Sequence, residues 1–300
     1  MSLHEEGRLS SLPSFFAGWA GCGRHDIVTP MPKAFVFSVG VLLLGCLFTS
    51  GFAAEKRARP EDLKAPARAR TAQTASVFAT GEALSYIAKL NDLPAGDGAL
   101  RLWTDHQPQQ DIYRVMAQGR TNELVDMLFR VRGTADGAFT VKGLTPISFR
   151  FAYTERDRPR ELDVRFDPAQ KALVGLSKRK DRVRKRSEPA AGVNDPLSAL
   201  YVLRSRELVP GTPQRLEVFT GKDRYRIVAH VIRRENVLVA GEERAALRLQ
   251  LAGTQIGDGK QRNVLPEETL LWVSSDAKHV PLKLESLLPF GLLVVELHEP

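Results

Sequence analysis

The sequence contains very little cysteine. Its two cysteines, Cys22 and Cys46, both lie within the first 53 residues. A chain cut after residue 53 would keep no thiol, so its stability would come from an apolar core rather than from disulfides. Hydrophobic residues make up 43% of the sequence, which is enough to build such a core.

Motifs that mark common enzymes and metal sites are also missing. The sequence has no Gly-x-Ser-x-Gly, no Walker-type loop, no His-Glu-x-x-His and no Cys-x-x-Cys. The four histidines after residue 53 are widely spaced, and we interpret His230, on an apolar strand face, as a buried hydrogen-bonded residue rather than a metal ligand. We therefore expect no catalytic residue, no cofactor and no metal, and predict that the protein is not an enzyme.

One long apolar run lies near the N-terminus. Residues 34–54 carry no charge, and the run is long enough to span a bilayer. Small residues, Gly51 and Ala53, stand at positions −3 and −1 of a cut after Ala53, as signal peptidase requires. Counted from Met31, the leader has an ordinary length, whereas counted from the first residue it is too long and too acidic. We predict a leader over residues 1–53, with the true start at Met31, a signal peptide over 31–53 and a periplasmic location.

Two alternatives to a cleaved signal peptide stay open. Leu43-Leu44-Gly45-Cys46 is similar to a lipobox, in which Cys46 would be acylated and anchor the protein by lipid. An uncleaved run would be a single-pass membrane anchor. Lys56 and Arg57 follow the run, and such charges usually stay on the cytoplasmic side, which counts against export.

Residues 54–76 are rich in Ala, Arg and Pro and contain almost no large apolar side chain. Such a segment cannot bury enough surface to offset its ordering entropy. We predict a disordered basic tether here, followed by a single β-rich domain over residues 77–300.

Apolar residues in this domain recur with a period of two, which is typical of strands with one buried face. Three examples are Leu84, Tyr86, Ala88 and Leu90, then Phe149, Phe151 and Tyr153, then Leu162, Val164 and Phe166. Turn residues such as Asp167-Pro168 separate the runs. The pattern predicts a mainly β fold: a strongly curved antiparallel sheet or partial barrel of about ten strands.

Two segments favour short helices packed on this sheet. Asp195 has the position of an N-cap and Pro196 that of the first helical residue, with apolar residues at helical spacing after them. In the second segment Leu124, Leu128 and Val131 would fall on one side of a helix. We expect both helices on or beside the concave face of the sheet.

A basic run occupies residues 178–186. Its cations are Lys178, Arg179, Lys180, Arg182, Arg184, Lys185 and Arg186. Together with the net charge of +8, the run favours binding to anionic lipid head groups, lipopolysaccharide or a membrane surface. The alternative is a solvated strand edge that discourages pairing with other strands. Nucleic-acid binding is disfavoured, because the run has no aromatic side chain to stack on bases.

Five segments carry a family resemblance. They are "GEALSYIAKLNDLPAGDGAL", "TNELVDMLFRVRG", "NDPLSALYVLR", "AGEERAALRLQL" and "LWVSSDAKHVPLKLESLLPFGLLVVEL". In this order, from Gly81 to Leu297, they resemble successive landmarks of the bacterial envelope family named domain of unknown function 3108. The resemblance implies export, a curved sheet similar to that of lipoprotein-carrier-like envelope proteins, and no recognised activity. The basic run is a departure from the family pattern.

These observations favour an exported, non-enzymatic cell-envelope protein that binds or carries a lipid-like amphipathic ligand on the concave face of its sheet. The aromatic and apolar residues expected at the ligand are Trp103, Leu128, Phe129, Phe149, Phe151, Tyr153, Tyr201 and Trp272. A structural or assembly partner of another envelope protein is the alternative, and an uncharacterised envelope hydrolase comes third.

Overall fold

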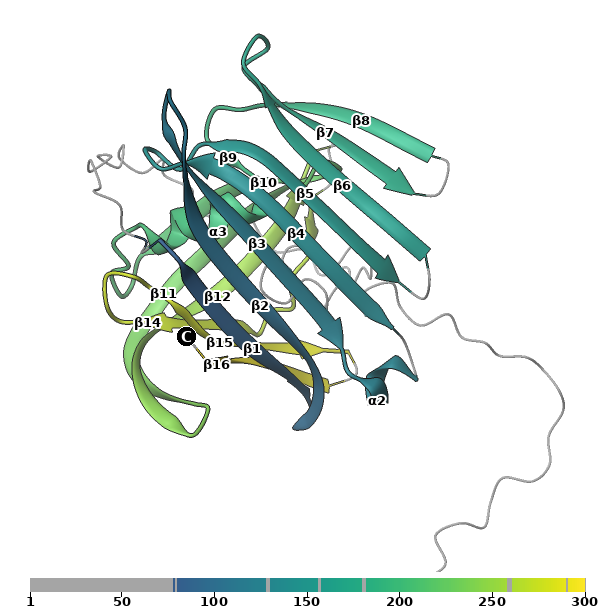
Figure 1. Cartoon of the computed structure of the whole chain (residues 1–300). Helices are drawn as coiled ribbons and strands as arrows, with labels where there is room; N and C mark the ends of the chain where they lie inside the picture. The colour runs from purple at the N-terminus through teal and green to yellow at the C-terminus, as the bar shows by residue number, and fades with distance from the viewer. Residues whose placement is uncertain are drawn as a thin grey trace, which may run out of the picture. The chain divides into compact units, whose positions relative to one another are not determined.

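The computed structural model describes residues 78, 80–127, 130–155, 158–179, 182–257, 261–289 and 291–299 (Figure 1). The predicted leader with Cys46 and the predicted tether lie outside the described residues. Within these ranges the chain forms one sheet of sixteen strands and two helices.

The first half of the chain is an antiparallel meander, in which each strand pairs with the next. Its strands are β1 (Glu82–Leu90), β2 (Leu93–His106), β3 (Asp111–Thr121), β4 (Val131–Thr140), β5 (Pro146–Glu155), β6 (Arg158–Asp167), β7 (Ala172–Arg179) and β8 (Arg182–Pro189). A short helix, α2 (Glu123–Asp126), joins β3 to β4. Asn91 and Asp92, both with positive φ, form the tight turn between β1 and β2.

The second half contains the remaining strands and the longer helix, α3 (Pro196–Arg204). Its strands are β9 (Val193–Asn194), β10 (Pro213–Phe219), β11 (Arg224–Val239), β12 (Glu242–Ile256), β13 (Arg262–Asn263), β14 (Thr269–Ser274), β15 (Pro281–Leu288) and β16 (Gly291–Glu299). The last strand, β16, pairs with β1, so both halves form one continuous sheet from β8 to β9.

The two ends of this sheet come close to each other. Arg224, at the start of β11, forms an ion pair with Glu188 of β8, with 3.0 Å between Nη1 and Oε2. The turn before β11 also lies against β7, since a Cβ at Gly175 would come within 2.4 Å of the Cα of Gly221. Only glycine allows this approach of two backbones. The curved sheet is therefore nearly closed and barrel-like.

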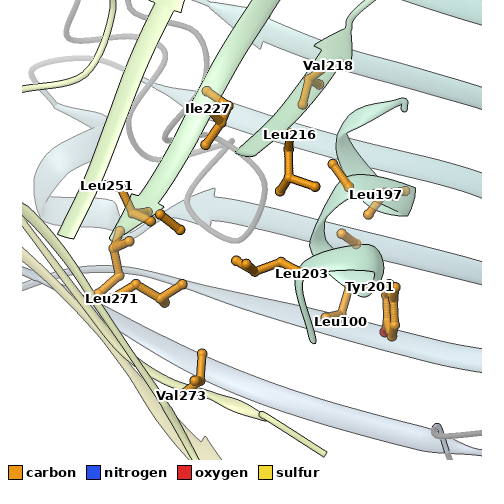
Figure 2. Packing of buried hydrophobic residues seen from close by; sticks show 14 of the residues in the cluster. Leu100, Leu197, Tyr201, Leu203, Leu216, Val218, Ile227, Leu251, Leu271 and Val273 are labelled. Carbon is orange, nitrogen blue, oxygen red and sulfur yellow. The ribbon is translucent and has the colours of Figure 1, made fainter. Parts of the chain in front are cut away.

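Helix α3 forms where the sequence predicts it. The Asp195 Oδ1 accepts hydrogen bonds from the backbone N–H groups of Leu197 and Ser198, at 2.8 and 3.1 Å. Leu197 and Tyr201 are fully buried, and α3 packs on the face of the sheet that we call the inner face (Figure 2). The opposite face is called the outer face.

The prediction for the second helix was wrong in length and burial. α2 has four residues, its Leu124 is exposed, and Val131 is the buried first residue of β4. The helix ends after one turn because Asp126 is bound by Thr121 and Arg132, which belong to the flanking strands. Leu128 lies outside the described residues.

The predicted strand number and strand direction also need correction. The described residues form sixteen strands rather than about ten. Three of the unexpected strands are β9 and β13, which have two residues each, and β8, in which most residues are charged. Such strands carry no apolar alternation. One pairing, β9 with β10, is parallel because the connection through α3 is a crossover.

Candidate functional site

The inner face of the sheet forms one apolar core around α3. The structure brings four of the predicted ligand-face residues to this side: Phe149, Phe151, Tyr153 and Tyr201. All four are buried, and the rings of Phe151 and Tyr153 are stacked with 4.8 Å between their centroids. These side chains therefore fill the core together with α3.

The two tryptophans predicted for the ligand face lie on the other side of the sheet. Trp103 is 39% exposed, because its neighbour Leu102 takes the inward position. Leu271 and Val273 point into the core (Figure 2), whereas the Trp272 ring lies between the Arg248 and Lys283 side chains. Trp272 is nevertheless 6% exposed and belongs to the same apolar cluster as its two neighbours. Leu128 and Phe129 lie outside the described residues.

The Trp272 indole is held on the outer face by charged neighbours. Its Nε1–H donates to the Glu235 Oε1 at 2.7 Å, and the Arg248 guanidinium lies 5.5 Å from the ring centroid. The sequence of β14 could not show which of its side chains face the core, because Leu271, Trp272 and Val273 are all apolar and all buried.

A buried ion pair fixes the C-terminal end of α3. The Arg204 side chain is 0% exposed, and its Nη1 and Nη2 donate to the two carboxylate oxygens of Glu82 at 2.8 and 2.6 Å. Tyr201 donates to the same carboxylate at 3.1 Å. The guanidinium also lies 5.0 Å from the centroid of Phe78 and 4.8 Å from that of Tyr201. Burial opposes the charged form, yet the Glu82 carboxylate holds the pKa of Arg204 above its ordinary value.

This pair joins α3 to β1 and was missed by the sequence analysis. The sequence does contain one signal of this pair. Glu82 alternates with Leu84 and Tyr86, whose side chains point inward, so the Glu82 side chain is expected to point inward as well. A carboxylate that points into the core needs a buried cation as its partner. Arg204, the last residue of α3, is that cation.

A second buried charge lies at the N-terminal end of α3. Asp195 is 0% exposed, and burial raises the pKa of its carboxyl from 3.8 to about 6. Its Oδ1 caps the helix, whereas no donor among the described residues reaches Oδ2. Ionisation of this group therefore opposes folding.

This arrangement predicts a pH dependence of stability. Because the folded pKa of Asp195 lies above the unfolded value, the folded state holds the proton more tightly between about pH 4 and 6. The proton bound to Asp195 therefore stabilises the folded state at low pH, and this stabilisation is lost as the pH rises through 6. The total decrease in the free energy of unfolding from this group is about 3 kcal/mol. We expect Asp195→Asn to remove this fall, measured as the difference between the urea unfolding free energies of wild type and variant from pH 4 to 7.5. A difference that stays constant over this range would contradict the burial argument.

The basic run is divided between the two faces of the β7–β8 hairpin. Lys178 pairs with Val183 and Lys185 with Leu176, and these four side chains lie on the outer face. The arginines 182, 184 and 186 alternate with them, and Arg186 donates to Glu188 at 2.8 Å. Lys180 lies outside the described residues. The run is therefore not one continuous patch.

The outer face of β5 to β8 contains a hollow with a volume of about 810 Å³. This volume is within the range of small-molecule sites, roughly 300–1,000 Å³. We call it the outer hollow. Its lining consists of Arg150, Glu161, Asp163, Arg165, Phe166, Asp167, Pro168, Val174, Leu176, Lys178, Val183 and Lys185.

Most charges of the outer hollow are already bound within the protein. Arg150 pairs with Glu161 at 2.8 Å and Arg165 with Asp163 at 3.2 Å. The hydrogen bond from Arg150 is also the main reason why the pKa of Glu161 lies below its ordinary value. Lys178 and Lys185 differ, since neither has an acidic partner within ion-pair distance in the part of the chain that the structure describes. Lys178 stands opposite Glu161 in the β6–β7 register and contributes to the lowered pKa of that carboxyl, but the Glu161 carboxylate is hydrogen-bonded by Arg150. The outer hollow thus offers two ammonium groups without a short ion pair beside exposed apolar side chains.

Histidine and acidic residues form no comparable site. The described ranges contain no group of three His, Cys, Asp or Glu side chains that could hold a metal ion. His230 is exposed rather than buried, because Ala229 and Val231 take the inward positions. In the same ranges no helix has the length and apolar character needed to cross a bilayer.

Comparison with known proteins identifies the family of the chain and finds three solved structures with low similarity. Three solved structures are similar: a beta-barrel-like protein of domain of unknown function DUF1849 from Brucella abortus, a candidate lipoprotein from Parabacteroides distasonis, and a candidate exported protein with a YmcC-like fold from Bacteroides fragilis. Their identities to this chain are 10%, 6% and 10%, with TM-scores of 0.46, 0.30 and 0.29. The matches cover 72%, 74% and 74% of this chain and 94%, 95% and 95% of those chains.

No curated protein matches the chain. The family described as "Protein of unknown function (DUF3108)", in contrast, matches residues 85–298, in agreement with the resemblance seen in the sequence. This match extends over nearly the whole sheet, from β1 to β16. The chain therefore belongs to the DUF3108 family of proteins of unknown function.

Proposed function

We propose that this protein is an exported, non-enzymatic protein of the cell envelope that binds an anionic amphipathic, lipid-like ligand in the outer hollow. The observation that carries the proposal is that Lys178 and Lys185, neither of which forms a short ion pair with a described residue, lie beside an exposed apolar strip. The inner face suits a ligand less well, because Phe149, Phe151 and Tyr153 are already buried against other residues of the core.

The register of the β7–β8 hairpin explains why the outer hollow suits an amphipathic anion. Each lysine stands opposite an apolar residue, Lys178 opposite Val183 and Lys185 opposite Leu176. The two ammonium groups therefore flank Leu176 and Val183, which are both exposed. A phosphate or carboxylate head group can bind the lysines while the start of an acyl chain covers the apolar strip.

Export is part of the proposal and rests on the sequence of residues 31–53. Cleavage after Ala53 leaves a chain without cysteine, which begins at Ala54. N-terminal sequencing of the protein purified from the envelope checks this: a start at Ala54 supports cleavage, whereas an acylated Cys46 would show a lipid anchor instead.

Binding of lysophosphatidylglycerol to the protein, purified after expression with its own leader, tests the ligand site. We expect Lys178→Ser with Lys185→Ser to weaken binding by about 2 kcal/mol, or roughly 30-fold, since each cation contributes about 1 kcal/mol near an anionic group. Leu176→Ser should weaken binding of lysophosphatidylglycerol and of zwitterionic lysophosphatidylcholine alike, because it removes apolar contact. Isothermal titration calorimetry measures each affinity.

A charge-matched control separates the outer hollow from the net charge of the protein. Lys142 and Lys278 are exposed and lie outside the outer hollow. Lys142→Ser with Lys278→Ser removes the same charge and should leave the affinity unchanged. Equal losses in both double variants, or none in either, would contradict the proposed site.

A further inference from the structure

Five large apolar side chains are exposed at one end of the sheet. They come from the start of β2, from α2 with its C-cap residue, and from the paired ends of β15 and β16. We call these five residues the apolar rim. Their exposed fractions are 61% for Leu93, 54% for Leu124, 77% for Met127, 50% for Leu287 and 39% for Leu292. Single exposed apolar residues are common, but a group from three separate segments needs an explanation.

Hydrogen bonds hold the three segments of the apolar rim together. The Asn91 N–H donates to the Leu292 carbonyl at 2.9 Å, and the Leu292 N–H donates to the Asn91 Oδ1 at 2.9 Å. Asn122, the N-cap of α2, donates through Nδ2 to the Pro94 carbonyl at 2.7 Å. Figure 1 shows the β1–β2 turn and α2 at the same end of the sheet. The apolar rim is therefore a built surface rather than three independent loop tips.

The apolar rim is not an extension of the core. Leu288 and Leu293 are buried in the core on the inner face, so Leu287 and Leu292, next to them in the chain, point outward and form a cross-strand pair. Leu93 stands directly opposite Leu90, and paired residues lie on the same face of a sheet. Because Leu90 packs against the core, Leu93 lies on the inner face. Apolar groups thus occur on both faces of the sheet at its end, as expected for an edge that enters an apolar medium.

Exposed arginines lie at the same end of the sheet as the apolar rim. In an antiparallel meander every second connection lies at the same end, so the last residues of β5 and β7 and the first residues of β6 and β8 lie at the end that carries the apolar rim. Arg158, Arg179 and Arg182 flank these connections and are exposed. None of the three forms an ion pair with a side chain that the structure describes; Arg158 stands opposite Glu155 in the β5–β6 register. α2 leads into β4, and β7 is three strands away from β4 in the sheet. The end of β7 with Arg179 therefore lies roughly 14 Å from the start of β4.

We propose that this end of the protein docks on an anionic lipid bilayer. The apolar rim enters the boundary between head groups and acyl chains, and Arg158, Arg179 and Arg182 bind lipid phosphates beside it. A combination of inserted apolar groups and adjacent basic groups is what stable attachment to a bilayer surface requires. The docking surface goes beyond the proposed function, because it uses none of the residues that line the outer hollow.

Flotation with vesicles of phosphatidylglycerol and phosphatidylcholine tests the docking surface, again with protein expressed with its own leader. We expect Met127→Ser with Leu292→Ser to lower vesicle binding roughly tenfold. Arg179→Ser with Arg182→Ser should lower it as well and should weaken its salt dependence, since exposed charges are screened over about 8–10 Å. Pure phosphatidylcholine vesicles should bind the wild type weakly.

Matched variants at other sites keep the test decisive. Leu238 and Val209 are also exposed apolar residues but lie outside the apolar rim. Leu238→Ser with Val209→Ser should leave vesicle binding unchanged, and thermal melting confirms that each variant is folded. Equal binding by the rim variant and the wild type, or no binding of the wild type to anionic vesicles, would overturn the inference. Rim variants that lose vesicles but keep lysophosphatidylglycerol separate this inference from the proposed function.

Discussion

Replacing Arg204 with methionine should lower the free energy of unfolding by about 3–5 kcal/mol, because it leaves the Glu82 carboxylate buried without its cation. The Arg204 side chain is fully buried, and that of Glu82 is 11% exposed, so water cannot replace the lost partner. Methionine keeps most of the volume beside Phe78 and Tyr201. The change therefore acts through charge more than through packing. Urea unfolding of the purified protein measures the loss.

Two comparisons show whether the loss comes from the orphaned carboxylate. Adding Glu82→Gln to Arg204→Met should recover a large part of the stability, because no buried charge remains. Arg120→Met, in contrast, breaks the exposed ion pair with Asp97 and should cost less than about 1 kcal/mol. If Arg204→Met and Arg120→Met cost the same, the buried pair is not what fixes α3 to β1.

Phe151→Ala should destabilise the protein by about 3–5 kcal/mol without changing its affinity for lysophosphatidylglycerol. Phe151 is 4% exposed and stacked on Tyr153, so its removal leaves a cavity in the core. The proposed ligand site lies on the opposite face of the same strands, where Arg150 and Lys178 line the outer hollow. Melting curves and titration calorimetry on one sample give both quantities.

The opposite result identifies an inner ligand site. If Phe151→Ala costs little stability but reduces lysophosphatidylglycerol binding, the ring faces a ligand rather than the core. Phe151→Leu serves as the control, since it keeps most of the apolar volume and should cost less than about 1.5 kcal/mol.

Local signals in the sequence were sufficient for the elements that bury one regular face. Leu84, Tyr86 and Ala88 show the period of two that β1 has, and all three are buried. Asp195 and Pro196 define the start of α3 by cap chemistry that acts within one helical turn. In both cases the signal lies within a few neighbouring residues of the chain.

The remaining features depend on partners far apart in the chain. Glu82 and Arg204 meet only because α3 crosses the inner face near β1. Trp272 has no sequence signal for its outward position, which follows from the partners Arg248 and Glu235 on other strands. β8 is charged at most of its positions and forms a strand because β7 offers it an edge to pair with.

The candidate site could be predicted in composition but not in arrangement. The sequence shows that cations gather over residues 178–186. The register of one hairpin then separates Lys178 and Lys185 from the arginines and places them beside Leu176 and Val183. A shift of that register by one residue would move Lys185 of β8 to the other face, away from Lys178, which β6 holds in place.

Native mass spectrometry of the protein purified from the cell envelope, followed by solvent extraction, shows whether the outer hollow binds an anionic lipid. We expect an anionic lipid bound to the wild type, lost from Lys178→Ser with Lys185→Ser, and retained by Lys142→Ser with Lys278→Ser. A wild-type protein without lipid, in a stable complex with another envelope protein, would favour the assembly role and contradict lipid binding. A lipid that the Lys178→Ser, Lys185→Ser variant retains would contradict the outer hollow as the binding site.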